Sequence, residues 1–237
     1  MRALRVIGLS IRDFYEEMFL FVPLSLVWWW WLPALLLISL AGLVPTNPVW
    51  GVPVGFSLFL ILVSPGSAGL AHLGYRIAHE RRVDSGFFKD AVREMWWPSV
   101  RVGALNAVVL ITMVVNLYFY AQFNSWIRLI SILWIYGLIL WAVGQLYLFP
   151  LLFEQNEPRV LLVFRNAVIL VLAQPLFSLV VFIGALVLTV ICTIIPVLLV
   201  LIWPGLMALI GSRAVADILE EARAQAAQAR GEGDEEE

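Results

Sequence analysis

Cysteine and lysine each occur only once in the 237 residues, as Cys192 and Lys89. A single cysteine excludes an intramolecular disulfide and a metal site built from several thiolates. Charge of either sign is also scarce, because Asp, Glu, Lys and Arg make up 14% of the chain, against roughly 25% in soluble domains. The sequence therefore lacks the composition of a soluble domain.

Long parts of the chain have no charge at all. Apart from Arg128, every charged residue falls in one of four blocks, at 2–17, 76–101, 154–165 and 213–237. The stretches between them are apolar, and the chain as a whole is 62% hydrophobic with a mean hydropathy of +0.92. Because a charged side chain is costly inside a bilayer, this segregation predicts an all-α, polytopic transmembrane bundle.

The apolar stretches also predict the number of spans, each of which needs about 20 apolar residues. Six spans are expected, near residues 20–44, 55–78, 102–123, 127–153, 176–195 and 197–211. The stretch 167–210 is too long for one span, and Pro196 and Pro204 provide places to break it. A count of five would require one of the proline-broken segments to be re-entrant.

The cations predict the orientation. With six spans, both termini and both charged loops lie on one side, which then has 14 Lys and Arg residues, while the other side has only Arg128. The positive-inside rule places the richer side in the cytoplasm. Asp13, Glu16 and Glu17 precede the first apolar run, so the N-terminus is not read as a cleaved signal peptide.

Three parts follow from these boundaries: an amphipathic interfacial helix at 1–18, a six-span membrane domain at 19–219, and an Ala-rich helix end with a disordered acidic tail at 220–237. The first helix either grips the inner leaflet or a partner, or is a lead-in to the first span.

A second amphipathic helix is expected at about 84–97, in the cytoplasmic loop, where Asp84 or Ser85 can cap it. Its candidate docking residues for a partner protein are Phe88, Lys89, Arg93 and Trp96. The alternative, which we favour, is that this helix merely covers the bundle.

Small residues recur on one face of the second span. The stripe consists of Ser64, Ser67, Ala71, Gly74 and Ala78. Because small residues let helices approach closely in lipid, the stripe is predicted to be the tightest helix contact. Pro65 and Gly66 are predicted to interrupt this helix.

A few polar residues lie inside the apolar stretches, and His72, Asn106, Asn116 and Gln145 are candidates for a polar cavity. Hydrogen bonds between helices explain such residues equally well. His72 could ligate a metal or a chlorin or relay protons, but it lacks a second ligand, so a structural histidine is favoured. The four tryptophans at 28–31 point in different directions on a helix and are read as an interface anchor rather than a pigment site.

The motifs of common enzymes are absent from the sequence. The sequence has no Gly-rich phosphate loop, nucleophile elbow or paired histidines at metal spacing. Its aromatic residues lie in the spans, so it has no basic, aromatic-rich surface for nucleic acid. The absence of Asp, Glu and Lys from the spans argues against a proton- or sodium-coupled carrier. No enzymatic activity, cofactor or metal is therefore expected.

Short motifs suggest a family. Residues 65–70 read Pro-Gly-Ser-Ala-Gly-Leu, residues 80–84 read Glu-Arg-Arg-Val-Asp, and Phe87-Phe88, Phe149-Pro150 and Arg165-Asn166-Ala167 follow. Over about 60–220 the chain resembles the YesL-like family of bacterial integral membrane proteins, which has no established activity. It departs from that family in the proline-rich linker at 45–53 and in the acidic tail.

The resemblance implies a multi-pass protein of the bacterial inner membrane with an accessory role beside carbohydrate uptake systems. Together with the missing catalytic motifs, it predicts a non-enzymatic accessory or scaffold protein whose partners are the lipid bilayer and a transporter permease or membrane sensor. The alternative is a passive channel or uncoupled carrier for a small neutral solute, lined by Asn106, Asn116 and Gln145.

Overall fold

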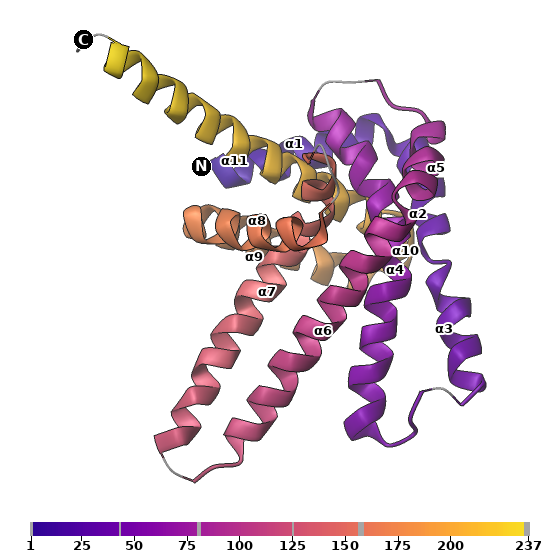
Figure 1. Ribbon diagram of the computed structural model, residues 1–237. Coiled ribbons are helices and arrows are strands. Elements are labelled where there is room, and N and C mark those ends of the chain that lie inside the picture. The colour runs from indigo at the N-terminus through magenta and orange to yellow at the C-terminus, as the bar shows by residue number, and fades with distance from the viewer. Residues whose placement is uncertain (1, 43, 80–81, 125, 156–158, 235–237) are drawn as a thin grey trace.

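The computed structural model describes residues 2–42, 44–79, 82–124, 126–155 and 159–234, and every regular element in these ranges is helical (Figure 1). The expected all-α class is confirmed. The elements are α1 (Arg2–Glu16), α2 (Met18–Trp28), α3 (Trp31–Leu40), α4 (Pro48–Ala78), α5 (Ser85–Glu94), α6 (Trp96–Ala121), η1 (Trp126–Leu129), α7 (Ile130–Phe153), α8 (Val160–Ala173), α9 (Pro175–Ile194), α10 (Pro196–Leu201) and α11 (Trp203–Asp234).

Five helical segments are long and apolar enough to cross a membrane. They are Met18–Leu40, Val54–Ala78, Trp96–Ala121, Trp126–Phe153 and Pro175–Ile194. They coincide with the first five predicted spans. The sixth, expected at 197–211, is not a separate helix, because α10 and the start of α11 divide it. The chain therefore has five candidate spans in its described part.

The region of the missing sixth span is a helical hairpin. Gln174, which directly precedes α9, donates a hydrogen bond to Glu221 of α11. Near the other end of α9, Thr189 accepts a hydrogen bond of 2.9 Å from the indole of Trp203, the first residue of α11. α9 and α11 are therefore antiparallel. The turn between them contains extended Ile195 and then Pro196, which begins α10, so the helix breaks at one of the predicted prolines.

One helix break lies within the first two spans. The first span breaks at Trp29 and Trp30, between α2 and α3. Pro33 lies in the first turn of α3, where a helix does not require its missing N–H. The second span is not interrupted at Pro65 and Gly66, because α4 runs through both residues as one helix. A Cβ at position 66 would lie 3.0 Å from the ring of Trp28, so the glycine leaves room for that ring.

The C-terminal helix continues further than expected. α11 runs without a break from Trp203 to Asp234, so helix extends into the acidic tail that was predicted to be disordered. Its residues 222–228 are exposed, and this part projects from the bundle (Figure 1). Residues 235–237 of the predicted acidic tail lie outside the described residues.

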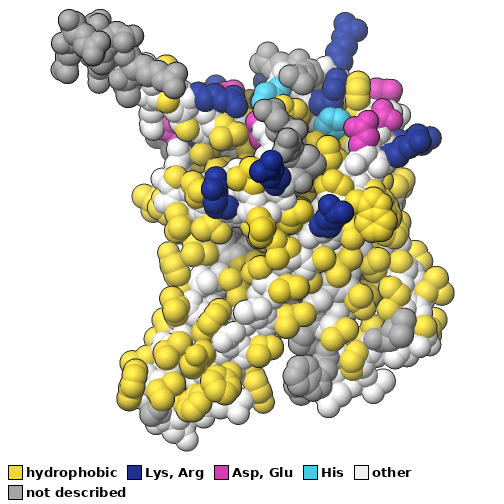
Figure 2. Space-filling model, viewed as in Figure 1, with side chains coloured by type: hydrophobic (Ala, Val, Ile, Leu, Met, Phe, Trp, Pro, Cys, Tyr) yellow, Lys and Arg dark blue, Asp and Glu magenta, His cyan; other side chains and the backbone are white. Residues whose placement is uncertain are grey.

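Packing is concentrated at one end of the molecule. The buried residues of α6 lie between Ser99 and Leu110, and those of α7 between Val143 and Leu152. α3 has no buried residue. Visible charged side chains gather at this same end, whereas apolar side chains cover the rest of the face (Figure 2). We call these two parts the charged end and the apolar end.

Candidate functional site

A cavity of about 410 Å³ lies between the helices, and we call it the central cavity. Its walls come from α4, α6, α7, α9 and α11, with Trp28 of α2 added. Most of the lining is aliphatic or aromatic. The volume falls within the range of about 300–1,000 Å³ that is usual for small-molecule sites. The cavity is therefore large enough to be a binding site.

The main polar feature of the central cavity is an amide pair. Asn106 Nδ2 donates to Gln145 Oε1 at 2.7 Å, and Gln145 Nε2 donates back to Asn106 Oδ1 at 3.2 Å. Trp141 Nε1 also donates to Asn106 Oδ1 at 2.8 Å. Trp141 and Gln145 lie one helical turn apart on α7, so both side chains reach Asn106 of α6. Reciprocal bonding satisfies both amides without a ligand.

Two further indole groups on the cavity wall are also paired. Trp28 Nε1 donates to Ser67 Oγ at 3.0 Å, and Trp203 Nε1 donates to Thr189 Oγ1 at 2.9 Å. The rings of Trp28 and Trp203 meet edge to face, with centroids 5.8 Å apart. No local pattern marks Trp141, Thr189 or Trp203 as a site residue, because the hydrogen-bond partner of each lies on another helix.

The chemistry of this wall favours an uncharged ligand. No ionisable side chain is found among the described residues that line the cavity. The indole N–H groups of Trp28, Trp141 and Trp203 are already bonded to the protein. A strongly polar solute would lose its hydration without gaining matching partners, which costs free energy.

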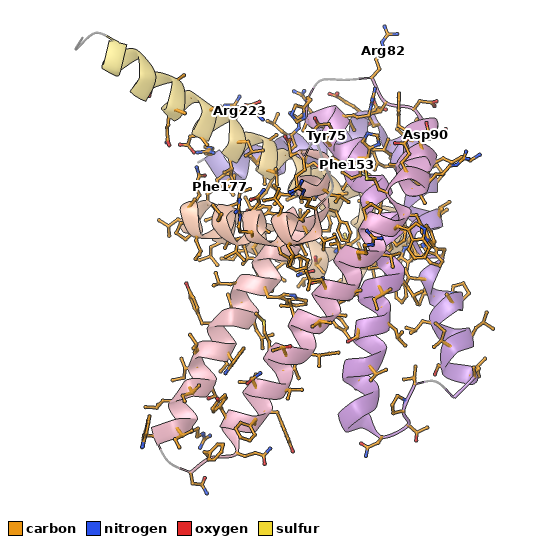
Figure 3. The ribbon with its side chains drawn as sticks, in the orientation of Figure 1. Tyr75, Arg82, Asp90, Phe153, Phe177 and Arg223 are labelled. Carbon is orange, nitrogen blue, oxygen red and sulfur yellow. The ribbon has the colours of Figure 1, made fainter. Side chains whose placement is uncertain are left out.

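The two other predicted cavity residues lie elsewhere. Asn116 is on the same helix as Asn106, but its side chain donates to the Thr112 carbonyl at 2.7 Å. His72 contacts the Phe87 carbonyl through Nδ1 at 3.2 Å. Its ring stacks on Phe153, whose position at the charged end is visible in Figure 3, at a centroid distance of 4.9 Å. The predicted four-residue polar cavity is thus reduced to Asn106 and Gln145. The bonding of His72 is that of a structural histidine.

The predicted small-residue stripe faces several neighbours. A Cβ on Gly74 would lie 2.6 Å from Ser212 Oγ of α11, and a Cβ on Gly103 of α6 would lie 2.2 Å from Ser64 Oγ. Ala71 is buried and its carbonyl accepts a hydrogen bond from Ser212 at 3.3 Å. The remaining members differ: Ser67 borders the cavity, and Ala78 is only half-buried. The stripe therefore packs against both α6 and α11 rather than forming one contact.

The predicted docking helix is α5. Asp84 caps it by accepting a hydrogen bond of 2.7 Å from the Ser85 N–H. Phe88 is buried against α4, where a Cβ on Gly69 would lie 2.6 Å from its ring. Phe88 nevertheless lines one surface pocket together with Lys89, Arg93 and Trp96, so the four predicted docking residues lie around the same hollow.

The outer face of α5 remains open. Lys89 and Arg93 are exposed on it, as is Asp90, which points outward in Figure 3, and Trp96 is exposed at the start of α6. Three of the four candidate docking residues therefore lie on the surface.

Ion pairs join the first and last helices. Arg2 pairs with Asp217 and Glu221, and Arg213 pairs with the buried Asp13 at 2.6 Å. Hydrogen bonds from Arg2 and then from Gln174 lower the pKa of Glu221. Burial acts to lower the pKa of Arg2, but its bonds to the two carboxylates outweigh burial and raise it. These pairs fix α1 against α11 at the charged end.

Three side chains near the loop after α7 form a small polar cluster. His79 Nε2 lies 3.5 Å from Glu154, and Arg223, labelled in Figure 3, lies 3.8 Å from the same carboxylate. Glu157 is outside the described residues. Within the part of the chain that is described, no group of three His, Cys, Asp or Glu side chains could hold a metal ion.

Comparisons with protein-family models, with curated proteins and with solved structures give no match.

Proposed function

We propose that this chain is a non-enzymatic accessory or scaffold protein of the bacterial inner membrane. The observation that most supports this function is the surface at the charged end, where α5 presents an open charged face and α11 projects beyond the bundle (Figure 1). Both helices are anchored: α5 through Phe88 on Gly69, and α11 through Gly74 and Asp13. A charged surface held in place by these contacts can meet a partner of complementary charge.

The proposed topology has both termini in the cytoplasm. α2 with α3, α4, α6 and α7 would cross the bilayer, and α9 with the start of α11 would enter and leave it at the charged end. Supporting this, Trp29 Nε1 donates to the Val200 carbonyl at 3.0 Å, so the hairpin turn lies beside the middle of the first candidate span. Four crossings keep the same cation asymmetry as six spans, because both numbers are even.

Labelling with a membrane-impermeant maleimide tests this topology in a Cys192→Ala background. Asn124→Cys should react from outside intact cells, whereas Asp84→Cys should react only after the membrane is opened. Val197→Cys, at the hairpin turn, should not react from outside although its side chain is 62% exposed. External reaction at Val197 would support six spans and contradict the hairpin.

The proposed partner is a transporter permease or a membrane sensor, and the resemblance to the YesL-like family suggests one that serves carbohydrate uptake. A photoreactive residue at Lys89 or Arg93 in native membranes should form one adduct, identified by mass spectrometry as such a protein. The buried neighbour Ala91, which is 2% exposed, is the matched control and should give none. Adducts containing only a second copy of this chain, or no adduct at either site, would contradict the proposal.

The alternative, passive transport of a small neutral solute, depends on the amide pair in the central cavity. Fewer observations support passive transport than the scaffold role, because Asn106 and Gln145 bond each other and most of the surrounding wall is apolar. Vesicles that contain the protein should swell no faster than empty vesicles in a sugar or a polyol. Faster swelling that Asn106→Leu abolishes would favour transport over the scaffold.

A further inference from the structure

We propose that the central cavity binds the hydrocarbon chain of a membrane lipid, whose headgroup stays outside. This is a binding function beyond the scaffold role. Three features of the described cavity point to this ligand: its place among the candidate spans, its uncharged wall and its mouth.

The cavity lies at the depth of the bilayer. Its wall includes Val63 of one candidate span, Gln145 of another and Phe182 of a third. These residues lie within the apolar lengths of the three segments, so the cavity is level with the hydrocarbon when α4 and α7 cross a membrane and α9 enters it. The molecules available at that depth are lipids, and their chains are already desolvated.

The wall selects against polar molecules. Phe59, Phe149 and Phe182 contribute aromatic faces, and no ionisable side chain is among the described lining residues. The amide groups of Asn106 and Gln145 are turned toward each other. Apolar cavities of this kind stay dry and accept apolar ligands, because water would find too few hydrogen-bond partners.

The mouth of the cavity faces outward among apolar side chains. Phe56 of α4 and Leu186 of α9 belong to the lining, yet they are 43% and 48% exposed. Neighbouring Ile183 and Val187 of α9 are exposed as well. A chain can therefore pass from the bilayer into the cavity without crossing a polar barrier, while a charged headgroup would remain beyond the rim.

Native mass spectrometry tests this binding on the full chain, purified from membranes and washed extensively in mild detergent. The expected result is one retained lipid per chain, because detergent removes surface lipid but not a chain held between helices. Its mass distinguishes an acyl glycerolipid from an isoprenoid lipid, and both have the required hydrocarbon chain. A retained sugar or polyol, or no retained molecule, would overturn the proposal.

Matched variants of α7 locate the site. Ala142 lines the cavity, so Ala142→Leu should reduce the retained lipid and Ala142→Phe should reduce it at least fivefold. Ile139, one turn away and 49% exposed, faces outward, and Ile139→Phe should leave retention unchanged. Thermal unfolding in detergent shows that each variant is folded, and the milder Ala142→Leu maintains the test if Ala142→Phe does not fold. Equal retention in folded Ala142 variants and wild type would contradict binding in this cavity.

Discussion

The charged end and the apolar end of this protein are built from the same helices but are packed differently. In α7, residues 143–152 include every buried residue of that helix, whereas residues 130–142 include none. α6 shows the reverse order along the chain, with its buried residues before position 111. Both helices therefore bury their side chains at the charged end. Figure 1 shows α6 and α4 diverging toward the apolar end, whereas α6 and α7 stay side by side.

This difference shows what determines helix packing in a membrane. Hydrocarbon solvates Leu and Ile as well as a protein interior does, so exposed apolar residues provide no drive to bring helices together. The contacts form where the chain supplies other interactions, namely glycine, internal hydrogen bonds and ion pairs. Gly103, Gly211 and Asp13 all lie at the charged end or next to the central cavity.

The largest expected difference between the ends is steric. Gly103→Leu should lower the free energy of unfolding by about 3 kcal/mol, at the upper end of overpacking effects, because a Cβ at Gly103 would already lie 2.7 Å from the Leu60 carbonyl oxygen. Gly137→Leu at the apolar end should change it by less than about 0.5 kcal/mol, because only Met113 Cε lies near, at 3.6 Å. Unfolding in one detergent measures both variants, and equal losses would remove the distinction between the ends.

The next effect concerns the ion pair between α1 and α11. Asp13→Ala should cost about 2 kcal/mol, less than the roughly 3–5 of a fully buried pair, because the Arg213 side chain keeps 21% of its exposure. Glu16→Ala removes a pair with Arg12 whose side chains are 59% and 65% exposed, and should cost less than about 0.5 kcal/mol. Comparable losses in the two variants would show that burial does not strengthen the first pair.

A smaller effect is expected at the amide pair. Asn106→Leu leaves Gln145 and the Trp141 indole without their shared partner and should cost about 1 kcal/mol, as hydrogen bonds between membrane helices do. Asn116→Leu removes only a bond to the carbonyl one turn earlier in its own helix, and its effect should be near zero. Thermal unfolding of the two variants compares the ends within one helix, because both positions lie on α6. A larger loss of stability from Asn116→Leu would show that the boundary between the two ends does not lie between these residues.

The smallest effect is the pH dependence of Glu221. Its pKa is lowered in the folded protein by hydrogen bonds from Arg2 and Gln174, so these bonds contribute their full stability above the pKa of the unfolded chain. That stability is lost as the pH falls through the lower folded value. Glu221→Gln should therefore lower the melting temperature at pH 7 slightly and make the difference from wild type vanish in acid. A difference that persists below both pKa values would exclude this carboxylate as the cause.

Residue patterns predicted the helical class, the first five candidate spans and the start of α5 at its Asp84 cap, because length, hydropathy and capping are local properties. They also identified Asn106 and Gln145 as polar residues within apolar helices. They did not predict that these two amides would meet while Asn116 lay apart. Asn106 and Asn116 lie only roughly on the same face of α6. The position of α7 decides that Asn106, and not Asn116, has a side-chain partner on another helix.

Charge and hydropathy along the chain were enough to locate the segments that can cross a bilayer, because an unpaired charge in hydrocarbon is costly in any fold. The packing of the helices, in contrast, makes α9 and α11 antiparallel, seats Phe88 on Gly69 and brings three indole groups to the border of a cavity. These features depend on contacts between residues far apart in the chain, such as Trp203 with Trp28 and Gly74 with Ser212. No local pattern encodes such contacts, because in lipid the partner of an apolar helix is chosen by shape and hydrogen bonding rather than by hydrophobicity.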